Sequence, residues 1–317
     1  MKSNELINKI FSNDRRAVSR SISIIESGNS NSTEILKEVH KKTGNAYRIG
    51  ITGPPGSGKS TLTNQLTKYY RKQNKTVGII AVDPTSPFSG GALLGDRIRM
   101  SEIGNDEGVF IRSMATRGSL GGLSKRTIDA ADILDAAGYD YIIFETVGVG
   151  QSELDIAKAA DTTIVVLVPE SGDSIQAMKA GLMEIADFFV LNKSDRPGSD
   201  TAITALKTIL MLRDHDEKSW LPNIIKAIAS ENKGITEIAE EIIRHQNYLN
   251  TNDLLKEKRG DHFRLRIKDI VETLIKNELW KDQREEALNE SLKKVVEGNT
   301  SPYQVAESLF NDYKKKI

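Results

Sequence analysis

An octapeptide built from glycine, proline, serine and one lysine carries the clearest chemistry in this chain. Residues 53–60 read GPPGSGKS and match the phosphate-binding pattern G-x-x-x-x-G-K-[ST] at every fixed position. Glycines let backbone N–H groups turn toward a phosphate, and a helix N-terminus adds a favourable dipole. Lys59 is expected to reach the β- and γ-phosphates of a nucleoside triphosphate, and Ser60 to ligate Mg²⁺.

The flanking residues favour a phosphate-binding loop over a Gly/Pro turn with a chance lysine. The apolar run Tyr47–Thr52 before the octapeptide predicts a buried strand, and Thr61–Leu66 after it predicts the first turns of a helix. The predicted nucleotide contacts in this loop are Gly53, Pro54, Pro55, Gly56, Ser57, Gly58, Lys59, Ser60 and Thr61.

An acidic element follows another apolar run. The run Tyr139–Phe144 is expected to form a strand and leads into Glu145-Thr146-Val147-Gly148. P-loop proteins commonly place an acidic residue here to hold the Mg²⁺ shell, and the glycine N–H lies near the γ-phosphate. Most GTPases use aspartate at this point. Glu145 is therefore expected to contact the ion through water or from a shifted strand.

Residues 192–195, Asn-Lys-Ser-Asp, follow a third apolar run and predict which base is bound. The Asp195 carboxylate can accept two hydrogen bonds from guanine, whereas adenine lacks this donor pair and would leave the carboxylate unsatisfied. The stem of Lys193 is expected to lie over the base, and Asn192 to tie the loop to its neighbours. Ser230 follows the last predicted strand, where backbone N–H groups can reach the guanine oxygen. The order of the motifs favours GTP over ATP.

Two further acidic residues are candidates for the metal shell. Asp83 ends a predicted strand beside the P-loop, where a carboxylate is costly to bury without a cation, and Asp96 lies in a glycine-hinged segment. The alternatives are a turn cap before proline for Asp83 and a surface helix cap for Asp96. A second glycine-rich stretch, Thr116–Ser124, is either a partner-sensing loop or a surface connection.

The elements that must position these residues alternate in type along the middle of the chain. Besides the strands before the P-loop and before Glu145, short apolar runs recur at Thr76–Val82, Val109–Ile111, Thr162–Val168, Phe188–Leu191 and Asn223–Ala229. Helical stretches separate most of them, which predicts an α/β fold: a P-loop NTPase G-domain with a mainly parallel, doubly wound sheet. Ligands of such sheets bind beyond the carboxyl ends of the strands.

Helical patterns flank this region on both sides. We expect an N-terminal helical extension over residues 1–45, a P-loop GTPase domain over 46–250 and a C-terminal helical arm over 251–317. The arm carries apolar stripes with helical spacing, including Ile267, Ile270 and Leu274. These stripes either pack on the nucleotide domain or form a dimer interface, and the pattern leaves both open.

The composition excludes several kinds of site. The 317 residues include 44 basic and 44 acidic ones, so no bulk charge points to nucleic acid or to an anionic membrane. The absence of cysteine excludes disulfides, thiolate zinc sites and cysteine nucleophiles. No apolar run approaches the roughly 20 residues of a membrane span, and the N-terminus has no apolar signal core. A cytoplasmic protein is expected.

Together, the motif blocks resemble those of the ArgK/MeaB family, the GTPases associated with methylmalonyl-CoA mutase. The resemblance covers about residues 47–230 and rests on GPPGSGKS, VDPTSPFSGG, LGDRIRM, RGSLGGL, ETVGVGQSE and NKSD in this order. It implies a G-domain of the metallocentre-assembly type and a homodimer formed through the C-terminal arm. It also implies that hydrolysis of GTP to GDP gates adenosylcobalamin loading and the protection or reactivation of an acyl-CoA mutase, most simply methylmalonyl-CoA mutase.

The resemblance also assigns residues. It matches Asp83, Asp96 and Glu145 to acidic residues around the metal and the switches. The segment Gly172–Lys179 matches a further switch region that responds to the mutase, and Gln176 and Lys179 are the members expected to matter for activated hydrolysis. The residues alone would predict only a helix start with solvated polar side chains there.

Hydrolysis is expected to proceed by in-line attack of water on the γ-phosphate, with Mg²⁺, Lys59 and backbone N–H groups offsetting the charge. Val149 follows Gly148, and no arginine finger is evident, so turnover should be slow until the mutase orders the switches. One alternative is a kinase or ATPase linked to lysine, arginine and ornithine transport, although no acceptor site is recognisable. Another alternative, a nickel-inserting GTPase, would need histidine or cysteine clusters, and the sequence contains none. A third alternative is a GTP-dependent scaffold that needs no turnover.

Overall fold

The computed structural model describes residues 3–29, 31–83, 101–115, 125–146, 152–171, 180–211, 219–280 and 282–315. The chain divides into two compact units, Met1–Lys258 and Arg259–Ile317. Among the described helices, none combines the length and the apolar character that crossing a membrane requires.

The first unit is organised around one seven-stranded sheet in which every paired strand is parallel. The strand order is β3-β2-β4-β1-β5-β6-β7. The strands are β1 (Tyr47–Thr52), β2 (Val77–Asp83), β3 (Val109–Ala115), β4 (Tyr141–Thr146), β5 (Thr162–Leu167), β6 (Phe188–Leu191) and β7 (Ile224–Lys226). The predicted doubly wound α/β fold is confirmed, because β1 lies in the middle and the chain extends the sheet in both directions from it.

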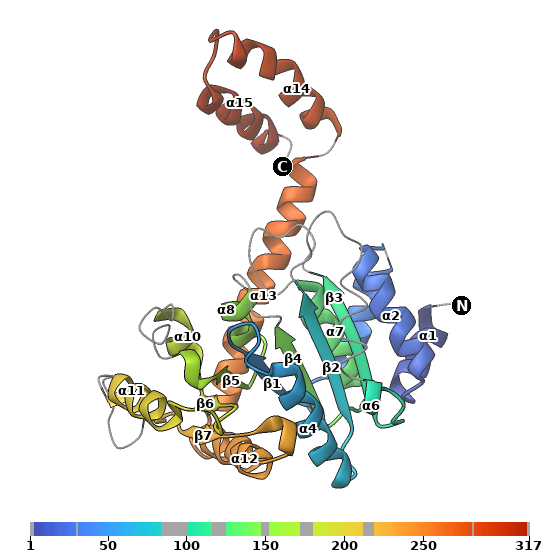
Figure 1. Cartoon of the computed structure of the whole chain (residues 1–317). Helices are drawn as coiled ribbons and strands as arrows, with labels where there is room; N and C mark the ends of the chain where they lie inside the picture. Colours follow the sequence, from blue (N-terminus) through green and yellow to red (C-terminus); the bar gives the residue numbers. More distant parts are fainter. Residues whose placement is uncertain are drawn as a thin grey trace. The chain divides into compact units, whose positions relative to one another are not determined.

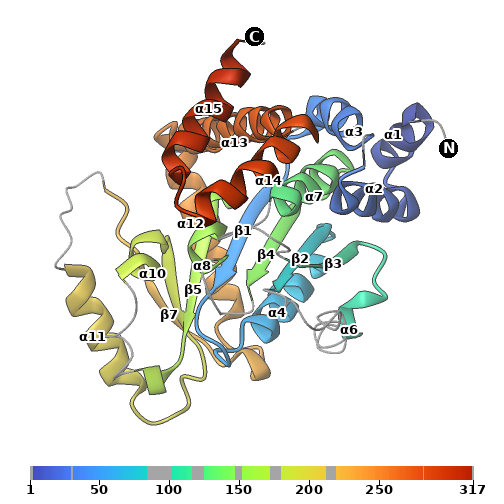
Figure 2. The same ribbon diagram turned by 90° about the horizontal axis from the view of Figure 1, so that it is seen from above.

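Helices cover both faces of this sheet, which explains why its central strands are apolar along their whole length. On one face, α4 (Lys59–Lys72), α6 (Ser101–Gly104) and α12 (Ile235–Thr251) contribute to a single core cluster with the strands. On the other face lie α7 (Lys125–Ala136) and the N-terminal helices. Figure 2 shows the strands between α4 and α7. The helices at the remaining connections are α8 (Ser152–Asp155), α10 (Ala180–Ile185) and α11 (Ser199–Met211).

The N-terminal helices belong to the core of the first unit. They are α1 (Ser3–Phe11), α2 (Arg15–Ser27) and α3 (Ser32–Val39), followed by the 3₁₀ turn η1 (His40–Lys42). Val18 and Ile22 of α2 are fully buried in the same cluster as Ile133 and Leu134 of α7. Figure 1 shows α2 beside β3 and α7. Burial of several large aliphatic side chains, each contributing about 1.5–3 kcal/mol, holds this extension in place.

The second unit is helical. Helix α13 (Leu254–Leu279) begins in the first unit, and α14 (Asp282–Val296) and α15 (Pro302–Lys314) follow it. A capping box begins α15: the Ser301 hydroxyl accepts from the N–H of Gln304, the Gln304 side chain accepts from the N–H of Ser301, and Pro302 is the first helical residue. The guanidinium of Arg284 lies 5.0 Å from the ring centre of Tyr313, so a cation–π contact joins α14 to α15.

Five predicted strands differ from the structure in their bounds, and two of them, β3 and β7, by more than two residues at the carboxyl end. Strand β3 continues past Ile111 to Ala115, because its pairing with β2 extends to Asp83 opposite Ala115. The sequence did not predict this extension, because the polar residues Arg112 and Ser113 interrupt the apolar run. Strand β7 stops at Lys226 instead of continuing to Ala229. Ile228 instead forms an antiparallel bridge with Lys233, and a 3₁₀ turn, η4 (Ala229–Glu231), follows.

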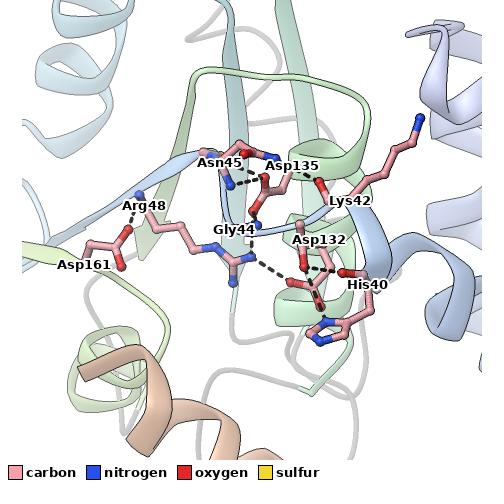
Figure 3. A network of polar contacts seen from close by, with 10 residues as sticks. His40, Lys42, Gly44, Asn45, Arg48, Asp132, Asp135 and Asp161 are labelled. Carbon is pink, nitrogen blue, oxygen red and sulfur yellow. Dashed lines mark hydrogen bonds and ion pairs between the residues drawn. The ribbon is translucent and has the colours of Figure 1, made fainter. Parts of the chain in front are cut away.

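A buried ionic network lies at the amino ends of β1 and β5 (Figure 3). The Asp135 carboxylate accepts backbone N–H bonds from Gly44, Asn45 and Ala46 at 2.9, 3.1 and 3.0 Å. The Nη2 atom of Arg48 lies 2.7 Å from Asp132 Oδ1 and 3.4 Å from Asp135 Oδ2. Burial opposes the charge of Arg48, but these carboxylates outweigh it and raise the pKa of the guanidinium. The network fixes the turn that leads into β1.

Candidate functional site

The loop between β1 and α4 requires glycine at two points where backbone or side-chain atoms approach closely. Gly53 has φ +135°, and a Cβ there would lie 2.2 Å from the carbonyl oxygen of Val166. Gly58 has φ +91°, and a Cβ there would lie 2.2 Å from Asn192 Nδ2. Other residues at either position would be strained and would collide with their neighbours. The pattern glycines at 53 and 58 therefore bring the loop against β5 and against the loop after β6.

Lys59 begins α4 and is buried, with 5% of its surface exposed. Its ammonium donates to the carbonyl oxygens of Gly53 and Pro54 at 2.8 and 2.9 Å. A buried ammonium is stable only when acceptors surround it. These acceptors are neutral carbonyls of the loop itself, so an anionic phosphate entering the loop offers the lysine stronger, charge-assisted bonds.

Ser60 and Glu145 meet at the carboxyl ends of β1 and β4. The Ser60 hydroxyl donates to Glu145 Oε1 at 2.5 Å, and the Glu145 side chain is 5% exposed. Glu145 lies inside β4, one residue before its end, opposite Ile51 of β1. A hydroxyl and a carboxylate are the hard oxygen donors that Mg²⁺ prefers, and a cation would reduce the cost of burying this carboxylate. The pair fits a magnesium site.

Asn192 connects three loops at the same edge of the sheet. Its Nδ2 donates to the carbonyl of Ser57 at 2.8 Å, and its Oδ1 accepts from the N–H of Ala229 at 3.0 Å. Lys193 has φ +56° and donates from Nζ to the carbonyl of Gly56 at 2.9 Å. The loop after β6 and the turn after β7 are thus held against the phosphate loop by two adjacent side chains.

Asp195 and Ser230 lie next to this junction. Ser230 is in η4, directly after Ala229, whose N–H binds Asn192. A lysine that the sequence did not single out, Lys233, lies close by and pairs with Glu231 at 2.6 Å. The hydrogen bond and charge of Glu231, with a smaller effect of Asp195, raise the pKa of Lys233. No signal in the sequence pointed to Lys233, because surface lysines are common.

An ion pair beside the Asn-Lys-Ser-Asp loop was also missed. The Nη1 atom of Arg196 lies 2.5 Å from Glu170 Oε1, and both side chains are about half exposed. The hydrogen bond from Arg196 lowers the pKa of Glu170. Glu170 belongs to η3 (Pro169–Ser171), which follows β5 and directly precedes residues 172–179. Sequence reasoning had no signal for this pair, because 26 residues separate its members.

Several predicted site residues lie outside the described part of the chain: Asp96, Gly148, Gln176 and Lys179. Asp83 ends β2, and the description of that residue covers its backbone only. Within the described ranges, no group of three or more His, Asp or Glu residues is placed to hold a metal ion. The described donors for a cation are Ser60 and Glu145.

The described residues form one site from the loops after β1, β6 and β7, the first residues of α4 and the carboxyl end of β4. It holds a buried ammonium, a hydroxyl–carboxylate pair and the junction made by Asn192. A buried ammonium beside oxygen donors for a divalent ion suits the polyphosphate of a nucleotide. The Asp195 loop lies where the base of that nucleotide would extend.

Comparisons with known proteins agree with this geometry. The model of the family described as "Methylmalonyl Co-A mutase-associated GTPase MeaB" matches residues 18–284. A protein of Pyrococcus horikoshii, described as a candidate GTPase, is 50% identical over 310 residues, 96% of each chain. The GTPase ArgK of Escherichia coli is 36% identical over 264 residues, 80% of this chain and 79% of its own. A crystal structure of a LAO/AO transport system kinase has a TM-score of 0.73 at 26% identity and covers 98% of this chain and 97% of its own.

Proposed function

Because this chain belongs to the MeaB family of methylmalonyl-CoA mutase-associated GTPases and is therefore a GTP hydrolase, we propose that its turnover gates cofactor delivery to an acyl-CoA mutase. In this function, GTP hydrolysis controls the loading of adenosylcobalamin and the protection or reactivation of the mutase, in the cytoplasm. Methylmalonyl-CoA mutase is the expected partner. The family match over residues 18–284 supports this choice of partner.

The observation that carries the nucleotide part is the junction at Asn192. Its side chain joins the carbonyl of Ser57 in the phosphate loop to the N–H of Ala229 in the last turn. A nucleotide spans the same two regions, because its phosphates occupy the first and its base the second. Asp195, three residues after Asn192, then selects guanine through two hydrogen bonds that adenine cannot donate.

The described residues divide the work of hydrolysis among them. Lys59 exchanges its loop carbonyls for the β- and γ-phosphates and offsets the charge that develops on their oxygens. Ser60 and Glu145 would hold the Mg²⁺ shell, with Asp83 and Asp96 as further acidic members. Mg²⁺ itself neutralises charge on the phosphate oxygens. We assign Gln176 and Lys179 to hydrolysis that the mutase stimulates, and the N–H of Gly148 to the γ-phosphate.

We also propose that the second unit forms the homodimer. Helix α13 has no buried residue, and its aliphatic side chains are about half exposed, with Leu274 at 63%. Covering such a stripe with a second copy would remove several large apolar side chains from water. Leu274→Asp should convert a dimer to a monomer in analytical ultracentrifugation. Met211→Asp, at an exposed apolar residue of α11, is the matched control and should leave the mass unchanged. A monomeric wild type would refute the dimer.

The test of the function compares hydrolysis of GTP by the purified protein with and without methylmalonyl-CoA mutase and adenosylcobalamin. We expect slow hydrolysis alone, a rise of at least tenfold with the mutase, and little hydrolysis of ATP. Lys179→Ala should abolish the rise, whereas Lys37→Ala, on the exposed side of α3, should preserve it. A mutase that neither binds nor changes the rate would refute this partner. Full cofactor loading by the Lys179 variant would favour the scaffold without turnover.

The alternative function is a kinase linked to amino-acid transport. A solved relative carries the name LAO/AO transport system kinase, which is the observation that keeps this alternative. The two functions differ in the acceptor of the γ-phosphate, which is water for a GTPase and a protein side chain for a kinase. Incubation with γ-labelled GTP and a cell extract separates them: label that appears on a protein faster than as free phosphate would favour the kinase.

A further inference from the structure

Two exposed ion pairs lie close to the carboxylate that is expected to read the base. Arg196 follows Asp195 directly in the chain, and its Nη1 atom lies 2.5 Å from Glu170 Oε1. Lys233 follows the last strand, and its Nζ atom lies 2.6 Å from Glu231 Oε2. Each of these two cations therefore pairs with a carboxylate other than Asp195.

Backbone contacts bring Lys233 into the neighbourhood of Asp195. The N–H of Ser194, directly before Asp195, donates to the carbonyl of Ala227 at 3.1 Å. Ile228, the next residue, exchanges two backbone hydrogen bonds with Lys233, at 3.1 and 3.2 Å. The loop that carries Asp195 and the turn that carries Lys233 are thus joined within one residue of the bridge.

The turn presents the Lys233 ammonium from a constrained backbone. Gly234, next to Lys233, has φ +81°, and a Cβ there would lie 2.3 Å from the carbonyl oxygen of Lys226. The ammonium is therefore placed by its own side chain and by the carboxylates around it. The hydrogen bond and charge of Glu231 raise the pKa of Lys233, and the charge of Asp195 adds a smaller increase. Both carboxylates act on the same ammonium, and Glu231 is the one that binds it.

The Asp195 carboxylate is available to a ligand. Its side chain is exposed, and within the described ranges no ion pair or hydrogen bond engages it. A carboxylate reads guanine by accepting from the ring N1–H and from the exocyclic amine, which occupies both of its oxygens. A cation bound to the same carboxylate would compete with these two donors. The affinity for guanine therefore depends on where the neighbouring cations are held.

We propose that Glu231 and Glu170 are positioning residues of the guanine site, each holding a neighbouring cation so that Asp195 stays free to accept from the base. Without Glu231, the flexible side chain of Lys233 turns toward Asp195 and pairs with it. Exposed ion pairs are weak, so this competition lowers the affinity for a guanine nucleotide severalfold and does not abolish binding. The inference rests on the proposed reading of guanine by Asp195 and is independent of the mutase.

The test measures GDP binding by isothermal titration calorimetry, because GDP carries the base and has no γ-phosphate to lose. Glu231→Gln should weaken binding about threefold at about 50 mM salt and less than about 1.5-fold at about 500 mM, where ion pairs are screened. Glu170→Gln should behave in the same way, and it keeps the proposal falsifiable if the first variant does not fold. Glu237→Gln, at an exposed glutamate in the first turn of α12, is the matched control. Loss of a negative charge by itself favours a polyanion, so the control should bind GDP at least as tightly as the wild type.

Two double variants separate competition for Asp195 from a structural effect of the substitution. Adding Lys233→Gln to Glu231→Gln should restore wild-type affinity, because the competing cation is gone. In an Asp195→Asn background, Glu231→Gln should cause no further loss. Wild-type affinity in both single glutamate variants, or a loss that Lys233→Gln does not restore, would overturn the positioning role and leave the reading of guanine intact. Unchanged affinity in Asp195→Asn alone would refute the reading of guanine, and the positioning role with it.

Discussion

The two ends of the central sheet both bury charged side chains, but they satisfy them with different partners. At the amino end, Asp135 accepts three backbone N–H bonds and lies within ion-pair distance of Arg48. At the carboxyl end, Lys59 donates to two neutral carbonyls, and Ser60 donates to Glu145. Charged partners are costly to replace, whereas neutral carbonyls yield readily to a phosphate. The difference teaches that the partners of a buried charge, rather than its burial, distinguish a binding site from a stabilising network.

The largest effect should come from Lys59→Ala at the carboxyl end. We expect GTP hydrolysis to fall about 10³-fold, because the variant loses a charged donor to the phosphates, while the free energy of unfolding changes by less than about 1 kcal/mol. Steady-state phosphate release and urea unfolding measure the two quantities. Lys37→Ala should change neither. A Lys59 variant that unfolds readily but retains activity would break the comparison between the two ends.

Asp135→Ala should show the opposite behaviour at the amino end. The change leaves three backbone N–H groups and part of the Arg48 charge without their acceptor, so we expect a loss of about 3–5 kcal/mol in unfolding free energy. The KM for GTP should remain within twofold at temperatures where the variant is folded. Glu5→Ala is the control, since Glu5 lies in α1 and forms an exposed pair with Lys9 at 2.9 Å, and its loss should be far smaller than that of Asp135.

A smaller effect, on specificity, is expected from Asp195→Asn within the carboxyl end. The amide offers one acceptor and one donor where the carboxylate offered two acceptors, so GTP affinity should fall about 10–100-fold. Xanthosine triphosphate carries a carbonyl in place of the guanine amine and should gain affinity by a similar factor. Competition binding with the two nucleotides measures this exchange. Asp200→Asn, which affects only the exposed pair with Lys226, should preserve the preference for GTP.

The sequence predicted the carboxyl end far better than the amino end. Phosphate-loop chemistry depends on contiguous residues, so Lys59 and Ser60 were identifiable from a single motif, and β1 and β6 have the predicted bounds. The network around Asp135 joins residues about 90 positions apart. No periodicity marks such pairs, because their spacing in the sequence depends on the topology. For the same reason the pair of Glu170 and Arg196 gave no signal, since its members are 26 residues apart.

The smallest effect should be a pH dependence that belongs to the amino end alone. His245 of α12 is buried, and desolvation lowers the pKa of its imidazole, outweighing the opposite effect of Asp187. Its Nδ1 lies 2.7 Å from Thr162 Oγ1, which is 2.6 Å from the Tyr47 hydroxyl. Its Nε2 lies 3.4 Å from Asp187 Oδ1, and the other charged groups around it are Glu241, Arg244 and Lys258.

Because the imidazole takes up a proton less readily when folded, the unfolded chain binds more protons as the pH falls below about 6.5, the value of a free histidine. The stabilisation from His245 is therefore present above that pH and is lost progressively as the pH falls toward the lower pKa of the folded protein. Urea unfolding at pH 7.5 and 5.5 should show a smaller pH-dependent loss for His245→Gln than for the wild type. His40→Gln, at an exposed histidine, should match the wild type. An equal loss in all three proteins would show that the amino end of the sheet is not proton-sensitive at this residue.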